Sequence, residues 1–242
     1  MIFNDKLWLV GGETSGASGS EALDDVWWTS DCVNWNQAAS SAEFWARGYH
    51  SMAVFGGKMW LLGGLTYDQD GTPVLLSDTW TSSNGINWTE IQSLVSFFPR
   101  MKGSAAAIGS NLWLFTGLGE NALGEIGPLS DGWYTSDGST WVRAFEKSGF
   151  TPRSGAVGLT SSGSCWLIGG LGQDSSGWDT YLNDVWATGD GLHWNNILDI
   201  APESPTHFGA RASHGGAVHG SRMFLSGGET DFGPINDVWS AQ

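Results

Sequence analysis

The sequence predicts an all-β protein built from five tandem repeats, and three regularities support this prediction. Tryptophan recurs every 53 residues, at Trp27, Trp80, Trp133, Trp186 and Trp239. An aspartate stands two positions before each of these residues, at Asp25, Asp78, Asp131, Asp184 and Asp237. A second aromatic row, soon followed by glycine each time, consists of Trp8, Trp60, Trp113, Trp166 and Phe224. Self-similarity at a fixed period of this length indicates a repeat architecture.

The first half of the second repeat predicts one β-hairpin. Two short apolar runs, His50–Phe55 and Lys58–Leu62, flank Gly56-Gly57, a pair that favours a tight hairpin turn. The next glycine pair, Gly63-Gly64, is expected to end the second strand and to open a polar loop.

The second half of the repeat adds two more strands. The polar loop runs to Ser77, Asp78–Ser82 is predicted as the third strand, and Trp88–Ile91 as the fourth. Four short strands in about 50 residues, repeated along the chain, are typical of β-propeller blades. We therefore expect a single β-propeller of five four-stranded blades. Its approximate repeats are 1–45, 46–98, 99–151, 152–209 and 210–242.

The repeats resemble kelch motifs over essentially the whole chain. The resemblance rests on the glycine pairs, the Asp-x-Trp strands and a trailing tryptophan in four repeats. These trailing residues are Trp35, Trp88, Trp141 and Trp194. The Asp-box of sialidase-like propellers fits less well, because the run Ser136–Trp141 is one residue short of its spacing. Membership of the kelch family implies a propeller that often serves as a binding or assembly module.

Both terminal repeats are incomplete. Residues 1–3 align with residues 53–55, so the first repeat lacks the start of its inner strand, and the last repeat has no fourth strand after Trp239. Three interpretations remain open. A ring of five blades closes without strand exchange, a longer chain has six or more blades, or a neighbouring molecule supplies a strand to an open edge.

Composition and charge exclude several classes of partner. The net charge is −15, with 25 acidic residues against 10 basic ones, so we expect no nucleic-acid binding. The sequence has no run of eighteen apolar residues, so we expect no membrane insertion. The first residues lack the features of a signal peptide. The acidic balance and the low lysine count favour an extracellular or periplasmic protein.

We expect function on one face of the molecule. Strands alternate in direction, so the segments between second and third strands emerge on the same side as the connections between repeats. This side is named the long-loop face, and its long segments are Glu13–Asp24, Leu65–Ser77, Leu118–Ser130 and Leu171–Asn183. The opposite side carries tight turns such as Gly56-Gly57. Binding residues concentrate on long loops held by a rigid scaffold.

Nine residues are predicted as ligand-binding candidates. Seven are aromatic residues of the long-loop face without a role common to all repeats: Trp45, Tyr67, Phe97, Phe98, Trp178, Tyr181 and Phe232. Exposed aromatic side chains suit sugar stacking or protein contacts. The other two are His50 and His214, which occupy equivalent positions three residues after Arg47 and Arg211. The repeated tryptophans, aspartates and arginines are assigned to the scaffold, with the arginines paired to carboxylates.

The sequence predicts no catalytic residue, metal or cofactor. The histidines show no metal-ligand spacing, and Cys32 and Cys165 lack a matching set of copper ligands. The first hypothesis is a non-enzymatic binding or assembly scaffold for a protein or a glycan. Two alternatives remain, a carbohydrate-acting propeller enzyme (hydrolase, lyase or oxidase) with its site at the channel mouth, and a structural subunit of an extracellular polymer. Self-association through the incomplete terminal blades is a further expectation.

Overall fold

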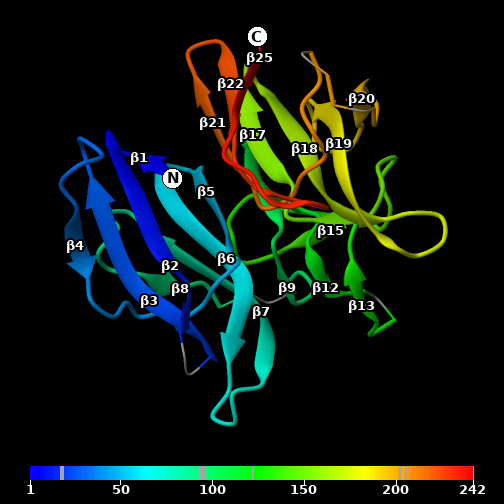
Figure 1. The fold of residues 1–242 in the computed structure, drawn as a ribbon. Coiled ribbons are helices and arrows are strands. Elements are labelled where there is room, and N and C mark those ends of the chain that lie inside the picture. The colour runs from blue at the N-terminus through cyan, green and yellow to red at the C-terminus, as the bar shows by residue number, and fades with distance from the viewer. Residues whose placement is uncertain (17–18, 93–95, 122, 202, 205, 242) are drawn as a thin grey trace.

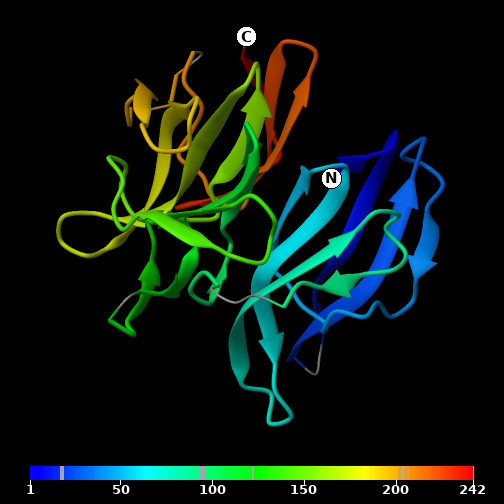
Figure 2. The same cartoon turned by 180° about the vertical axis from the view of Figure 1, so that it is seen from behind.

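The described residues form an all-β structure of antiparallel sheets, which confirms the all-β part of the predicted fold (Figures 1 and 2). The computed structural model describes residues 1–242 except 17–18, 93–95, 122, 202, 205 and 242. Every regular element in this part of the chain is a β-strand, and the described residues hold no helix long and apolar enough to cross a membrane.

The described strands assemble into seven antiparallel sheets. Five of them follow one another in chain order and are numbered here sheet 1 to sheet 5, and the two small ones are β13-β12-β9 and β23-β24. Sheet 1 contains β1 (Ile2–Phe3), β2 (Lys6–Gly16), β3 (Gly19–Thr29) and β4 (Asn36–Ala39). Sheet 2 contains β5 (Ser51–Phe55), β6 (Lys58–Tyr67), β7 (Pro73–Ser82) and β8 (Thr89–Glu90). Sheet 3 contains β10 (Ser104–Ile108), β11 (Asn111–Phe115), β14 (Gly132–Thr135) and β15 (Val142–Phe145).

The last two sheets follow the same order. Sheet 4 contains β17 (Val157–Ser161), β18 (Ser164–Gln173), β19 (Asp179–Thr188) and β20 (Asn195–Leu198), and β16 (Arg153–Ser154) also pairs with β18. Sheet 5 contains β21 (Gly215–His219), β22 (Arg222–Ser226) and β25 (Val238–Ala241). Short accessory strands are β9 (Arg100–Met101), β12 (Leu118–Glu120), β13 (Ile126–Pro128), β23 (Glu229–Thr230) and β24 (Gly233–Pro234).

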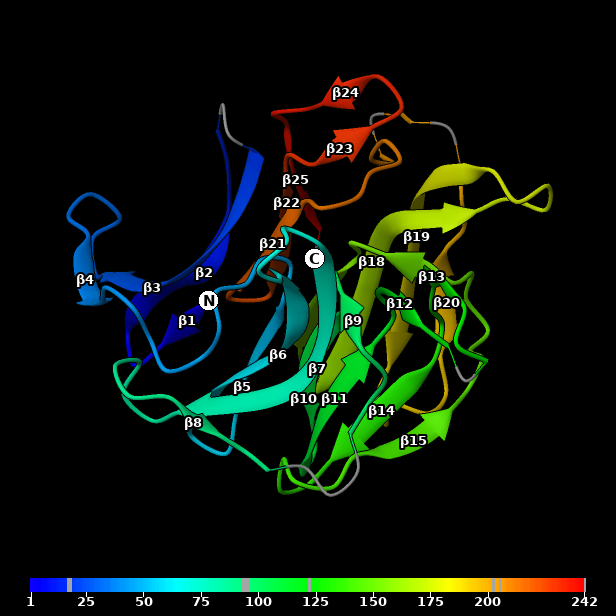
Figure 3. The same cartoon turned by 90° about the horizontal axis from the view of Figure 1, so that it is seen from below.

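The inner strands of sheets 2 to 5 pack against one another in succession, β5 on β10, β10 on β17, and β17 on β21. Figure 3 shows the five sheets succeeding one another around these inner strands. Sheets 1 and 5 share no extensive interface among the described residues. Leu9 of sheet 1 is 55% exposed, whereas Leu61 and Leu114, at the same place in sheets 2 and 3, are fully buried. The outer side of sheet 1 therefore lacks the cover that the next sheets have.

The core lies between neighbouring sheets and is rich in aromatic contacts. A phenylalanine from each of the three linkers that precede sheets 2 to 4 packs edge-on against the trailing tryptophan of the following sheet. The ring centres of Phe44 and Trp88 are 5.4 Å apart at 89°, and those of Phe97 and Trp141 are 5.0 Å apart at 85°. Phe150 repeats the contact with Trp194 in sheet 4, at 5.2 Å and 89°. The trailing tryptophans of sheets 2 to 4 are therefore packing residues between sheets.

The expectation that Gly63-Gly64 ends the second strand is wrong. β6 continues to Tyr67 and pairs with β7 from Pro73, so a predicted loop is a long hairpin. The pairing register shifts between Leu62 and Gly64, which marks a β-bulge. Gly63 has a φ of +56°, and a Cβ there would lie 2.8 Å from a backbone carbonyl oxygen. The glycines thus bend the strand toward the long-loop face without interrupting it.

Each repeated arginine joins a linker to the third strand of the next sheet, which confirms the predicted scaffold role. Arg100 Nη1 and Nη2 donate to the two carboxylate oxygens of Asp131 at 2.6 and 2.8 Å. Trp133 Nε1 also donates to Asp131, at 2.7 Å. We name this arrangement the arginine clamp. It recurs in the pairs Arg47–Asp78, Arg153–Asp184 and Arg211–Asp237.

Replacing Asp131 by Asn should destabilise the fold strongly, because Arg100 would keep a buried charge without its partner. We expect a loss of about 3–5 kcal/mol in the free energy of unfolding, measured by urea denaturation. Asp237→Asn is the matched control, since the Asp237 side chain is 37% exposed and that of Asp131 only 7%. Solvent screening should make the loss at Asp237 clearly smaller. Equal losses at the two sites would contradict this account.

Candidate functional site

The long hairpins and the linkers meet on the long-loop face, as predicted from strand direction. In Figure 1 the β2–β3, β6–β7 and β12–β13 hairpins extend past the sheets toward the bottom of the view. The arginine clamps lie at the base of the hairpins of sheets 2 to 5, since each arginine also donates to the backbone oxygen of Gly63, Thr116, Gly169 or Gly227. Arg47 Nη1, for example, donates to the Gly63 oxygen at 3.0 Å. Buried arginine–aspartate ion pairs therefore hold the hairpins of this face in place.

Backbone hydrogen bonds join the residues that lie two positions after each arginine, and we name this row the backbone belt. Lys102 N donates to the Tyr49 oxygen at 2.7 Å, Gly155 N to the Lys102 oxygen at 2.9 Å, and Ser213 N to the Gly155 oxygen at 2.8 Å. All four residues have left-handed backbone, with φ between +54° and +63°. The belt fixes Tyr49 and Lys102 as neighbours from consecutive sheets.

Glu13 lies among hydroxyl donors beside this belt. Tyr67 Oη donates to Glu13 Oε1 at 2.8 Å. Burial favours a raised pKa for Glu13, but the nearby hydroxyl groups of Tyr49, Ser20 and Tyr67 together lower it below its ordinary value. The nearby Glu13 carboxylate, followed by burial, raises the pKa of Tyr49 to about 12. Lys102 Nζ lies 4.9 Å from the centre of the Tyr49 ring. This cluster holds a carboxylate and protonated tyrosines ready for hydrogen bonding.

Glu229 is a second glutamate near the Glu13 cluster, on the side of sheet 5. It follows the glycine pair of its repeat, as Glu13 does in the first repeat, whereas the other three repeats have leucine there. Its charge contributes to the raised pKa of Tyr49. Burial, and then the charges of Glu229 and Asp231, raise the pKa of Tyr181. Glu229 is thus an electrostatic neighbour of both tyrosines, and it links the Glu13 cluster to the β23–β24 hairpin.

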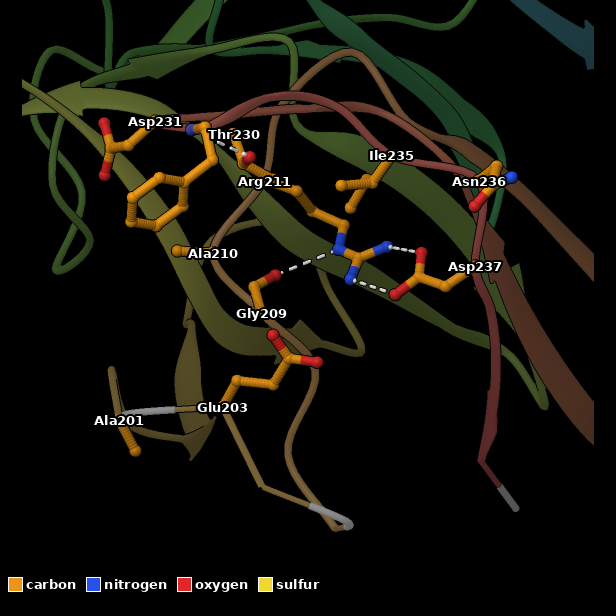
Figure 4. Close-up of a pocket in the computed structure, with 11 residues that line it drawn as sticks. Ala201, Glu203, Gly209, Ala210, Arg211, Thr230, Asp231, Ile235, Asn236 and Asp237 are labelled. Atoms are coloured by element: carbon orange, nitrogen blue, oxygen red, sulfur yellow. Dashed lines mark hydrogen bonds and ion pairs between the residues drawn. The ribbon is translucent and has the colours of Figure 1, made fainter.

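A pocket of about 440 Å³ lies between this hairpin and the linker that precedes sheet 5 (Figure 4). We name it the hairpin pocket. Its lining includes Glu203 from the linker and Asp231, Phe232 and Asn236 from the hairpin segment. Figure 4 shows the Arg211–Asp237 clamp at one side of the pocket, with the Glu203 carboxylate across from it. Phe232 is fully exposed, at 101%. The pocket therefore combines carboxylates, an amide and an unburied aromatic ring.

The hairpin pocket exists because the last repeat departs from the spacing of the others. Arginine and aspartate of the clamp are 31 residues apart in sheets 2 to 4 but 26 apart in sheet 5. The shorter hairpin leaves the Asp237 side chain 37% exposed, against 5% for Asp184. Hydrogen bonding from Arg211 lowers the pKa of Asp237 to about 2, so its carboxylate stays charged beside the pocket.

The predicted candidates fall into three groups. Trp45, Trp178 and Phe232 are exposed, at 68%, 75% and 101%. Tyr67, Tyr181 and Phe98 are half-buried. Phe97 and His214 are buried, and His50 is half-buried. Tyr67 and Tyr181 lie near the carboxylates of Glu13 and Glu229, and Phe232 lines the hairpin pocket. Trp45 and Trp178 do not line this pocket.

Sequence reasoning missed seven residues in and around the Glu13 cluster and the hairpin pocket. They are Glu13, Tyr49, Lys102, Glu203, Glu229, Asp231 and Asn236. One signal was available, since Glu13 and Glu229 replace a leucine that the other three repeats share. The described residues hold no group of three or more His, Cys, Asp or Glu side chains that could bind a metal ion.

Comparisons with known proteins identify the fold alone. No protein-family model and no curated protein matches the chain. A solved structure described as that of YjhT aligns with a TM-score of 0.72, over 98% of this chain and 78% of that chain, at 15% sequence identity. The all-β antiparallel architecture is therefore shared with YjhT.

His50 and His214 should make the fold acid-sensitive. Burial, and then the charge of Arg47 or Arg211, lowers the pKa of each ring to about 4. The unfolded chain binds these protons near pH 6.5. Stability from each histidine is therefore full above pH 6.5 and is lost as the pH falls toward 4, by up to about 3 kcal/mol each. Among the described residues neither ring nitrogen of His214 has a hydrogen-bond partner.

The replacement His214→Phe should flatten this dependence. We expect the difference in unfolding free energy between pH 7 and pH 4.5, measured in urea, to shrink relative to the native chain. His219→Gln, at an exposed position at the end of β21, is the control and should leave the difference unchanged. The same acid loss in all three chains would refute the assignment to His214.

Proposed function

We propose that the chain is a kelch-like β-propeller module that binds a glycan at the hairpin pocket without converting it chemically. The five sheets would be its blades, which the repeated sequence, the succession of inner strands and the aromatic inter-sheet core support. The long-loop face would be its binding face. The observation that carries the proposal is the fully exposed Phe232 beside the carboxylates and the amide of the pocket.

The pocket lining suits sugar hydroxyls. Carboxylates accept two or more hydrogen bonds, and an amide such as Asn236 both donates and accepts, which matches the mixed donor and acceptor character of hydroxyl groups. An exposed aromatic ring offers an apolar platform for the C–H face of a pyranose. The volume of about 440 Å³ lies within the usual range of small-ligand sites, about 300–1,000 Å³.

Electrostatics narrow the class of glycan. Glu203, Asp231 and Glu229 lie in or beside the pocket, and the whole chain carries a net charge of −15. Such a field repels carboxylated and sulfated sugars. Neutral sugars or amino sugars are therefore the ligand class that we propose.

The pKa directions favour binding over proton-transfer catalysis. A general acid or base works best when its pKa lies near the operating pH. The pKa of Glu13 is lowered, and those of Tyr49, Tyr67 and Tyr181 are raised. All four shifts lead away from neutrality, so these groups suit fixed hydrogen-bonding roles.

Removing the aromatic platform should weaken glycan binding. A neutral or amino-sugar oligosaccharide selected on a glycan array would be titrated calorimetrically. Phe232→Ala should raise its dissociation constant at least about tenfold, or ~1.4 kcal/mol. The control is Trp178→Ala, another exposed aromatic residue (75%) at the β18–β19 hairpin, which should bind as the native chain does. No binding of any neutral or amino sugar, or a loss in the control alone, would contradict the proposal.

A further inference from the structure

A second pocket lies at sheet 3, and two cationic side chains line it. We name it the sheet 3 pocket, and its volume is about 130 Å³. The β12–β13 hairpin, β15 and the linker after β15 all contribute to its lining. The cations are Arg143 of β15 and Lys147 of the linker. The pocket shares no lining residue with the hairpin pocket, so it is a separate site.

These two cations have no anionic partner within the fold. Both side chains are exposed, and in the described part of the chain neither makes an ion pair. The four clamp arginines, by contrast, are each bound by an aspartate. A guanidinium carries five N–H donors and an ammonium three. Arg143 and Lys147 therefore present donors that the scaffold itself does not use.

Aromatic rings hold the guanidinium of Arg143 in place. Its Cζ lies 5.6 Å from the centre of the Phe98 ring and 5.9 Å from that of the Trp133 ring. These two rings pack edge-on, with their centres 5.3 Å apart at 79°. Stacking on aromatic faces occupies the plane of a guanidinium and leaves the N–H groups at its edge free. Because the group is already positioned, less freedom is lost when it binds a ligand.

The scaffold does not require an arginine at this position. Arg143 lies opposite Trp133 in the pairing of β14 with β15. The residues at the same register in sheets 1, 2 and 4 are Gln37, Glu90 and Asn196. Two neutral amides and a carboxylate thus serve the same place in the other sheets. The positive charge in sheet 3 is a departure from the repeat, and a specific role would account for it.

The local charge of the sheet 3 pocket suits a ligand with one negative charge. Asp131 also lines the pocket, but Arg100 holds both of its carboxylate oxygens and balances its charge. Glu146 is the other carboxylate of the lining, so two cations and one free carboxylate leave a net charge of +1. Exposed charges farther than about 8 Å are largely screened at physiological ionic strength. The net charge of −15 on the whole chain therefore does not decide what this pocket binds.

Apolar walls favour an organic anion over an inorganic one. Phe98, Pro128, Leu129 and Pro152 line the pocket beside the cations. Inorganic phosphate has no apolar part to place against these side chains, and near neutral pH it carries more than one negative charge. A carboxylate carries one charge and accepts two parallel N–H bonds from an arginine. The rest of a small organic acid would contact the apolar wall.

We propose that the sheet 3 pocket binds the carboxylate of a small organic acid. Arg143 is the bidentate donor, and Lys147 is the second cation. Glu146 is available to accept a hydrogen bond from a hydroxyl or amino group of the same ligand. The proposal does not depend on glycan binding at the hairpin pocket, because it rests on different residues of a different sheet.

Titration with propionate tests the proposal, with propionamide as the uncharged counterpart. The full chain, labelled with ¹⁵N, would be followed by NMR through the indole N–H signal of Trp133, whose ring contacts Arg143. We expect saturable shifts with propionate and none with propionamide. Arg143→Gln should weaken propionate binding by at least about tenfold, as is typical when a hydrogen bond to a charged group is lost. The variant should fold, because Gln37 occupies the same register in sheet 1.

Two further variants keep the test specific. Arg222→Gln removes the same charge from an exposed position of β22 and should bind propionate as the native chain does. Arg143→Lys keeps the charge without the planar fork, so its affinity should lie between those of the native chain and Arg143→Gln. Absence of saturable shifts, equal binding of propionamide, or an unchanged dissociation constant in Arg143→Gln would overturn the proposal. Tighter binding of inorganic phosphate than of propionate would overturn it too, by assigning the pocket to phosphate.

Discussion

The buried arginine of each clamp is the interaction on which the rest of the structure depends. A guanidinium with 0–1% exposure is tolerated only when its donors are satisfied and its charge is paired. Arg153 meets this demand with Asp184, with the Gly169 oxygen and with the Thr151 oxygen of its own linker. One side chain therefore ties linker, bulge and third strand together. The indole nitrogen of the repeated tryptophan also donates a hydrogen bond to the clamp aspartate, which explains why aspartate always stands two residues before this tryptophan.

Departures from the repeat produce the features that suit binding. Where the clamp spacing is kept, the aspartate is better covered, with side-chain exposures of 22%, 7% and 5% at Asp78, Asp131 and Asp184. Where the hairpin is shorter, in sheet 5, Asp237 is uncovered and a pocket opens beside it. Glu13 and Glu229 likewise place charge at a position where the other three repeats have a buried or half-buried leucine. The repeats supply a rigid frame, and their exceptions supply chemically distinct surface.

The sequence predicted the strand order and the scaffold residues because both repeat, and a periodic pattern reports local structure directly. It failed at Gly63-Gly64, since a glycine pair is compatible with either a strand end or a bulge, and only the pairing with β7 decides between them. It could not separate Phe97 from Phe232. Phe97 is buried by Trp141, a residue far along the chain, while nothing covers Phe232. The Glu13 cluster was missed because its members meet only after sheets 1 and 2 pack together.

Hydrogen–deuterium exchange with and without a bound neutral or amino-sugar oligosaccharide tests the central claim most directly, that the long-loop face around sheet 5 is the binding surface. The account predicts slower backbone exchange on ligand addition in peptides that span Gly209–Arg211 and Glu229–Asp237. Peptides of the opposite face, such as those holding Gly56-Gly57 and Asp137-Gly138, should exchange unchanged. Protection centred on those tight turns, with none around Phe232, would contradict it.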